Sequence, residues 1–236
     1  MKYELTDETN GSGLRRIRAL RDIPSCGVKE GDLGGWVESE GNLTQEGDCW
    51  VFDDAQVCGN AQVFDAAQVC DNTQVGGNAH VPGNARVSDT AQVCGDARVF
   101  GIAMVGGNAR VFDNAQVFGN TRVFDNAQVS ETALIYGDAQ VCDNARVCGN
   151  ARVFDNAQVS ETALIYGDAQ VCGNAMVFGK ARVFDNAQVF DAAQVFDNAQ
   201  GCDTALIYGG ARVFGNAMVG GNARVFDAAV CGGVTS

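Results

Sequence analysis

The sequence predicts an all-β solenoid, in which short parallel strands wind into stacked coils. From Val51 onward a hexapeptide recurs, as in VFDDAQ, VCGNAQ and VFDAAQ, and thirty consecutive hexads extend to residue 230. Nearly every hexad carries Val and Ala in fixed slots, and most carry Gly, Asp or Asn between them. A fixed, short period is typical of a solenoid and not of a globular domain.

The hexad itself indicates short strands joined by sharp corners. The Val slot holds Val or Ile throughout except at Gly201, and the slot four residues later holds Ala except at Thr73 and Thr121. Because side chains alternate along a strand, we expect Val and Ala to point inward and Gln/Arg and Phe/Cys to point outward. The Asp/Gly–Asn pair should form the corner, since Gly and Asn tolerate positive φ. Gly201 should leave a local void.

The residues also resemble a known family. The pattern V-x-G-N-A-x over residues 51–230 resembles the hexapeptide repeat of left-handed parallel β-helices, the LpxA-like superfamily. The segment LRRIRALRDIPSCGVKEGDLGGWVESEGNLTQEGDCWVFDDAQV more specifically resembles the YdcK-like hexapeptide-repeat proteins. This resemblance implies left-handed, triangular coils of three hexads each. It therefore implies about ten coils, or a length of about 48 Å at roughly 4.8 Å per coil.

We expect two parts, an N-terminal capping segment at 1–50 and the hexapeptide-repeat solenoid at 51–236. Trp36 and Trp50 are large enough to cover the first coil, which a solenoid must hide from water. The C-terminal AAVCGGVTS contains no charged helix or loop that would close the last coil. Because open strand edges associate, we expect this coil to be buried in a homo-oligomer.

Composition and charge argue against several classes of partner. The net charge of −13 disfavours nucleic-acid binding, which draws on Lys and Arg. No run of eighteen apolar residues could span a bilayer, and MKYELTDETN does not have the layout of a signal peptide. A cytoplasmic location without membrane or nucleic-acid contact is therefore expected.

An exact duplication argues against a localised active site. The segment VFDNAQVSETALIYGDAQVC occurs at 123–142 and again at 153–172. The offset of thirty residues is five hexads, which is not a whole number of three-hexad coils. The two copies should therefore begin on different faces, an exchange that a localised active site would not easily survive.

His80, the one histidine, is a weak catalytic candidate. Acyltransferases of the fold that the resemblance implies use a His, often beside an extruded loop, but no such loop interrupts residues 51–230. Metal-dependent carbonic anhydrases of that fold use three His, which excludes this activity. An acyltransferase-like alternative would need a substrate cleft between subunits near His80.

Cysteines and acidic corners give only weak metal candidates, and no cofactor is predicted. No two of the ten Cys lie eighteen residues apart and no CxxC occurs, so reduced surface thiols are expected. Carboxylates about 5 Å apart on one edge should attract cations, unless they are simply solvated corner residues. The weak cation-site candidates are Asp53, Asp71, Asp89, Asp125 and Asp143.

Aromatic side chains concentrate on one predicted face. All 13 Phe and three of the four Tyr follow the Val slot, and eight of these sixteen rings fall on a single face. Such a strip exceeds the apolar surface that soluble monomers usually expose, although mutual stacking or polysaccharide binding could also account for it. The predicted interface residues are Phe64, Phe100, Phe118, Tyr136, Phe154, Phe190, Tyr208 and Phe226.

These observations favour a non-catalytic scaffold or interaction protein. It would self-associate through the aromatic face, the last coil, or both. The alternatives are the acyltransferase-like enzyme and an acidic protein that mimics DNA to inhibit a nucleic-acid enzyme.

Overall fold

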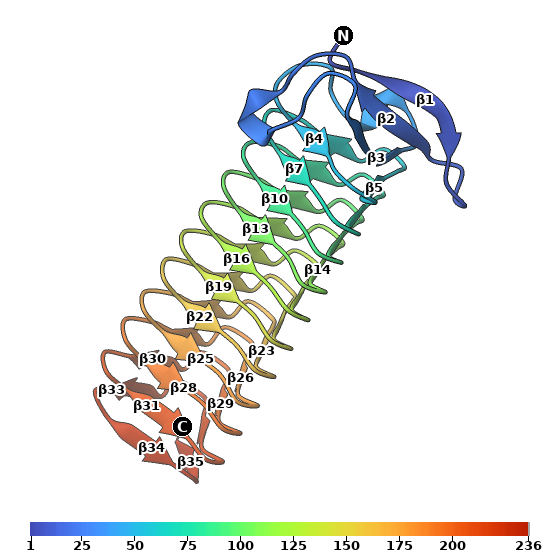
Figure 1. Ribbon diagram of the computed structural model, residues 1–236. Coiled ribbons are helices and arrows are strands. Elements are labelled where there is room, and N and C mark those ends of the chain that lie inside the picture. The colour runs from blue at the N-terminus through green and yellow to red at the C-terminus, as the bar shows by residue number, and fades with distance from the viewer. Residues whose placement is uncertain (236) are drawn as a thin grey trace. The chain divides into compact units, whose positions relative to one another are not determined.

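The computed structural model describes residues 1–235, and in this range it is an all-β solenoid of short parallel strands that follows an antiparallel N-terminal meander (Figure 1). The only helical segments described are two 3-10 turns, η1 (Pro24–Cys26) and η2 (Glu40–Asn42). No described helix has the length and apolar character needed to cross a membrane. The chain divides into two compact units, Met1–Gly119 and Asn120–Ser236, which are described in turn. The predicted fold class is confirmed, while the left hand of the coils stays a prediction.

The first unit opens with an antiparallel meander that changes to parallel pairing. Its strands are β1 (Tyr3–Thr9), β2 (Arg15–Ala19) and β3 (Leu33–Val37). β1 pairs with β2 and β2 with β3 in antiparallel fashion, and β3 then pairs in parallel with β5. Leu43 forms a parallel bridge to Val63. Residues 33–51 thus form an irregular coil before the hexads, within the segment predicted as a cap.

Three parallel sheets follow in the first unit. One continues from β3 through β5 (Gln56–Val57), β8 (Gln74–Val75), β11 (Gln92–Val93) and β14 (Arg110–Val111). The second contains β4 (Trp50–Val51), β7 (Gln68–Val69), β10 (Arg86–Val87) and β13 (Met104–Val105). The third contains β6 (Gln62–Val63), β9 (His80–Val81), β12 (Arg98–Val99) and β15 (Gln116–Val117); we call its outer surface the first aromatic face.

The second unit has the same three-sheet arrangement. One sheet contains β17 (Gln128–Val129), β20 (Arg146–Val147), β23 (Leu164–Ile165), β26 (Arg182–Val183), β29 (Gln200–Gly201), β32 (Met218–Val219) and β35 (Val234–Thr235). The next contains β16 (Arg122–Val123), β19 (Gln140–Val141), β22 (Gln158–Val159), β25 (Met176–Val177), β28 (Gln194–Val195), β31 (Arg212–Phe214) and β34 (Ala229–Cys231). The third contains β18 (Leu134–Ile135), β21 (Arg152–Val153), β24 (Gln170–Val171), β27 (Gln188–Val189), β30 (Leu206–Tyr208) and β33 (Arg224–Phe226); its outer surface is the second aromatic face.

The core consists of the Val and Ala columns, as predicted. From Val51 to Val225 these side chains are buried, and most residues between them are half-buried or exposed. Ser130 and Cys202 are buried although they follow the Val slot, and Ala229 in the last hexad is exposed. Each buried Val contributes on the order of 1.5–3 kcal/mol. At Gly201 the predicted void is partly filled, because Cδ1 of Ile207 lies 3.2 Å from where a Cβ of residue 201 would sit.

The corners contain the residues with positive φ, as expected. These residues occupy the first corner position, where Asp, Glu or Gly lies, and not the second position, where Asn is common. Within residues 1–235, all fifteen non-glycine residues with positive φ are Asp or Glu in this slot, with φ between 48° and 63°. In the last coil the register shortens, since Val230 pairs with Val213, seventeen residues earlier. β33 and β34 pair with a neighbour on one side only within the described residues, and Phe226 is 56% exposed.

The two threonines in the Ala column make a matched pair for a stability test. Both are fully buried. The Thr73 hydroxyl donates to the Cys70 carbonyl at 2.7 Å, whereas Oγ1 of Thr121 has no hydrogen-bond partner among the described residues. An unsatisfied buried hydroxyl costs about 1–3 kcal/mol. We predict that Thr121→Ala raises the free energy of unfolding by about 1 kcal/mol. Thr73→Ala should not raise it. Urea denaturation of both variants checks this, and a Thr121→Ala variant no more stable than the wild type would contradict it.

Candidate functional site

The corner carboxylates, first considered as cation ligands, accept backbone N–H groups from the next coil. Each of the five candidates does so through Oδ2, toward the residue eighteen positions later. The N···O distances are 3.4 Å for Asp53 to Asp71, 3.0 Å for Asp71 to Asp89, 2.7 Å for Asp89 to Gly107, 3.3 Å for Asp125 to Asp143, and 2.9 Å for Asp143 to Glu161. Hydrogen bonds to an ionised acceptor are about twice as strong as neutral ones. The carboxylates therefore have a structural role at the corners.

The second corner residue forms a parallel ladder of side-chain amides. Nδ2 of Asn60 donates to Oδ1 of Asn78 at 3.0 Å, and Asn78 in turn donates to Asp96 at 2.9 Å. In the second unit Asn198 donates to Asn216 at 3.1 Å. Both corner columns are thus bonded from coil to coil, which explains the Asp–Asn pattern of the hexad without a ligand.

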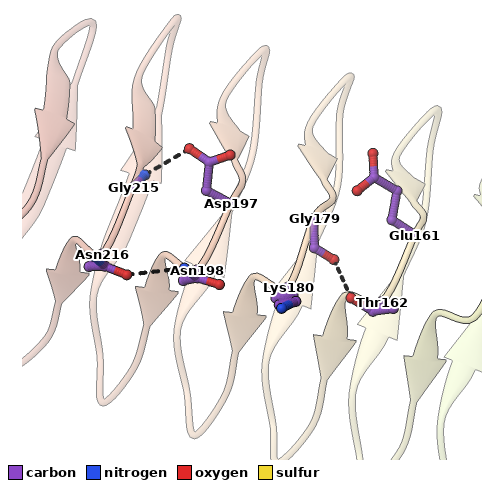
Figure 2. Close-up of a pocket in the computed structure, with 8 residues that line it drawn as sticks. All are labelled: Glu161, Thr162, Gly179, Lys180, Asp197, Asn198, Gly215 and Asn216. Atoms are coloured by element: carbon purple, nitrogen blue, oxygen red, sulfur yellow. Dashed lines mark hydrogen bonds between the residues drawn. The ribbon is translucent and has the colours of Figure 1, made fainter.

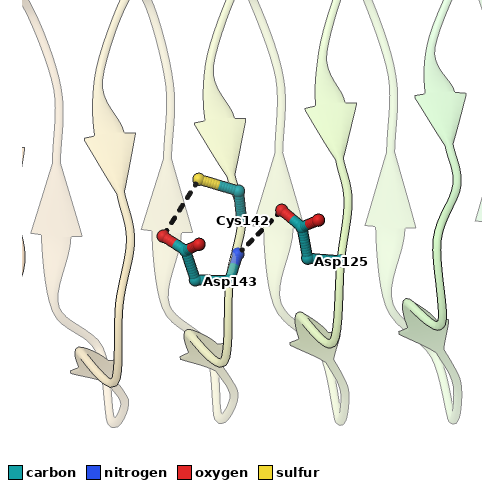
Figure 3. A group of neighbouring side chains, drawn as sticks. All are labelled: Asp125, Cys142 and Asp143. Atoms are coloured by element: carbon teal, nitrogen blue, oxygen red, sulfur yellow. Dashed lines mark hydrogen bonds between the residues drawn. The ribbon is translucent and has the colours of Figure 1, made fainter.

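One described cluster has a donor set suited to a metal ion. Asp125, Cys142 and Asp143 place two carboxylates and a thiol within 4.8 Å of one another (Figure 3). The thiol lies 3.7 Å from Oδ2 of Asp143, and burial, with the adjacent Asp143 carboxylate, raises the pKa of Cys142 to about 11. An ion would have to displace this proton and compete with the corner hydrogen bonds. The geometry therefore favours a hydrogen-bonded corner over a metal site.

A shallow hollow of about 460 Å³ lies on the same edge of the second unit (Figure 2). Gly179 and Gly215 lack side chains there, and Lys180 replaces Asn in the amide ladder. Asp197 accepts the Gly215 N–H at 3.0 Å, whereas no hydrogen bond of the Glu161 carboxylate and no ion pair of Lys180 is found among residues 1–235. The hollow is exposed and contains no paired acid and base.

His80 lies half-buried on the first aromatic face. On the adjacent coils its register partners are Gln62 and Arg98. Its ring meets that of Phe64 edge-on, at 6.4 Å between centroids and 83° between planes. No carboxylate bonds the imidazole in the part of the chain that the structure describes, so nothing there would orient it as a general base.

Aromatic rings stack along the faces from coil to coil. In the first unit Phe100 and Phe118 lie 4.8 Å apart with parallel planes. On the second aromatic face the stacked pairs are Tyr136–Phe154 at 4.9 Å and Phe190–Tyr208 at 5.0 Å, and Tyr208–Phe226 is tilted by 34° at 5.0 Å. Of the predicted interface rings only Phe226 is strongly exposed, since stacking covers part of the others.

All ten cysteines are free thiols, but the prediction that they lie at the surface is wrong for Cys49 and Cys202, which are buried. Three have a strongly raised pKa of about 11, which burial causes first and nearby carboxylates second: Asp71 beside Cys70, Asp143 beside Cys142, and Asp155 and Asp191 beside Cys172. A raised pKa keeps the neutral thiol at physiological pH, and the thiolate is the form that reacts and binds metals.

These thiols should be slow to alkylate. At pH 8 roughly one molecule in a thousand would carry a thiolate with a pKa near 11. We predict that iodoacetamide modifies exposed Cys231 well before Cys70, Cys142 and Cys172, and that the rates at these three rise tenfold per pH unit up to about pH 10. Peptide mass spectrometry over a pH series measures this. Rates equal to that of Cys231 at pH 8 would contradict it.

Comparison with known proteins agrees with the fold. Residues 55–71, 91–107, 145–161 and 169–183 match the family model described as YdcK beta solenoid repeat. No curated protein matches the chain. The matched stretches fall in both units and coincide with the Val and Ala columns of the core. The chain is thus a β-solenoid protein in which four stretches are similar to the YdcK beta solenoid repeat.

Proposed function

We propose that the protein is a non-catalytic scaffold that self-associates through the second aromatic face. The observation that carries this proposal is a contrast between two faces of the same unit. On the face of β25, β28 and β31, Phe178, Phe196 and Phe214 also stack, at 5.0 and 5.2 Å. There the Arg212 guanidinium lies over Phe196 at 5.3 Å and over Phe214 at 5.9 Å.

On the second aromatic face, no described Arg guanidinium lies over the rings of Phe190, Tyr208 and Phe226. Five of its six coils present an aromatic ring, and Leu134 and Leu206 lie half-buried beside the column. Contiguous apolar surface of this kind is typical of sites that contact another protein. Aromatic anchors also dominate the binding energy of interfaces, because a ring excludes much water at little cost in side-chain entropy.

Charge supports a second copy of the chain as the partner. Arg152 and Arg224 lie on one side of the aromatic column, and the corner carboxylates of Asp155, Asp191 and Asp227 follow on the other. Two such faces related by a two-fold axis parallel to the column place the basic side of each against the acidic side of the other. Complementary charges of this kind set the register of an interface.

The last coil contributes a second contact to the proposal. β33 and β34 present unpaired backbone groups on their outer side within the described residues, and Phe226 is 56% exposed. Open strand edges pair readily with other strands. Association at this coil would cover them.

A pair of double variants tests the aromatic face by multi-angle light scattering. We expect the wild type to form an oligomer and Phe190→Glu/Tyr208→Glu to be monomeric, because two carboxylates would have to be buried at the interface. Phe178→Glu/Phe196→Glu removes an equally stacked pair from the Arg-covered face, and it should keep the wild-type mass.

Circular dichroism of both variants confirms that the solenoid is retained. A wild type that is monomeric at high protein concentration would contradict self-association. An oligomer that both variants preserve would contradict the assignment to the second aromatic face.

A further inference from the structure

The aromatic column of the first unit is interrupted at Pro82. Pro82 follows β9 and lies between Phe64 and Phe100 in the column, one coil from each. Because proline cannot extend a ring into the stack, a hollow of about 330 Å³ opens there. The side chains lining it are Phe64, His80, Pro82, Arg98 and Phe100.

The thickness of this hollow suits one planar ring. Neighbouring rings in the column stack at 4.8 Å, as Phe100 and Phe118 do. Phe64 and Phe100 are two coils apart, so the space between them equals about two strand spacings, near 9.6 Å. A ring placed midway would contact both at ordinary stacking distance. The rings of Phe64 and His80, which lie on adjacent coils, are nearly perpendicular at 6.4 Å between centroids, and both border the hollow.

The hollow is bordered by basic groups. Arg98 and His80 are register partners on adjacent coils, and no ion pair of Arg98 occurs within residues 1–235. Of the three first corner residues next to it, Gly83 and Gly101 carry no charge, and the carboxylate of Asp65 accepts the Gly83 N–H at 3.0 Å. In a chain of net charge −13 this is an unusual surrounding, and it favours an anion.

The second unit contains the matched counter-example. Cys172 interrupts the aromatic column there, between Phe154 and Phe190. Its adjacent corners are Asp155, Gly173 and Asp191, and the two carboxylates raise the pKa of the Cys172 thiol further than burial alone. Arg152 lies beside this gap, but Gln170 and Gln188 occupy the positions that His80 and Arg98 have in the first unit. With two carboxylates and no basic group at these two positions, the gap should bind an aromatic anion less tightly.

We propose that the slot over Pro82 binds a planar aromatic carboxylate, with its ring between Phe64 and Phe100 and its carboxylate at Arg98. This binding activity is separate from the proposed self-association. Arg98 supplies the planar fork of donors that matches a carboxylate, and His80 borders the same side. The two phenyl rings supply apolar contact on both faces of the ligand.

The single histidine gives a direct readout. We would titrate the protein with 2-naphthoate and follow the ring protons of His80 by NMR. We expect a saturable upfield shift from the ring current of the bound naphthalene. The cation 2-naphthylmethylammonium, which has the same ring system, should produce no saturable shift. Equal shifts with both probes, or no saturation with 2-naphthoate, would overturn the proposal.

Three variants locate the site. Pro82→Phe restores the ring that the column has elsewhere and should abolish binding, whereas Cys172→Phe fills the gap of the second unit and should leave binding unchanged. Arg98→Gln introduces the residue found at the neighbouring Gln62 and Gln116 and should raise Kd roughly tenfold. Binding that survives Pro82→Phe would overturn the proposal.

Self-association is separated from ligand binding by light scattering on the same samples. A His80 signal that already shifts with protein concentration, and loses this dependence in Pro82→Phe, would show that a ring of a second copy fills the slot. That outcome would contradict binding of a small ligand and would make the slot part of the self-association interface. Failure of 2-naphthoate binding in a protein that remains oligomeric would reject the slot alone.

Discussion

The stack depends on how the backbone is satisfied at its corners. In the regular coils the N–H of the second corner residue reaches a carbonyl of the next coil, as Asn72 does with Asp89 at 2.8 Å. The N–H of the first corner residue points back toward the preceding coil, where the acceptor is a side-chain carboxylate eighteen residues earlier. An unpaired polar backbone group is costly wherever water is displaced, so an Asp at the first corner position stabilises the corner that follows it. Other corners have Gly at this position, as at Gly59 and Gly77, and offer no carboxylate to the next coil.

This constraint accounts for features that otherwise suggest ligand chemistry. The carboxylate must lie directly over the next corner, which requires a short side chain on a residue that tolerates the left-handed conformation, and Asp meets both conditions. The acidic charge of the chain and its rows of carboxylates thus follow in large part from the fold. Functional chemistry is then left to the outward slots of the faces. There neighbouring coils differ from one another, with bare rings on one face, rings under Arg212 on another, and a missing ring at Pro82.

Much of the architecture could be predicted from the period alone. The inward Val and Ala columns, the corner pair and the alignment of aromatics every eighteen residues follow from alternation along a strand and a fixed repeat. Conformational preference alone did not predict which corner residue has positive φ, because Asn tolerates positive φ better than Asp does. The hydrogen bond from the backbone N–H to the Asp carboxylate favours Asp at this position. Ile207, in the hexad after Gly201, fills part of the space at Gly201. This contact could not be predicted by comparing residues eighteen positions apart, because the two residues lie on different faces. The irregular coil at Leu33 lies outside the period altogether. That Pro82 and Arg98 line one hollow is seen only when residues on adjacent coils are considered together.

The most direct test of the corner account is the exchange rate of the Gly107 amide. Its N–H donates to Oδ2 of Asp89 at 2.7 Å. Asp89→Gly relieves the left-handed backbone but removes the acceptor, whereas Asp89→Asn retains an acceptor oxygen and tolerates the same φ. We predict that hydrogen exchange at Gly107, followed by NMR, accelerates on the order of tenfold in Asp89→Gly and changes little in Asp89→Asn. Unchanged protection in Asp89→Gly would contradict the central claim that the corner carboxylates hold one coil to the next.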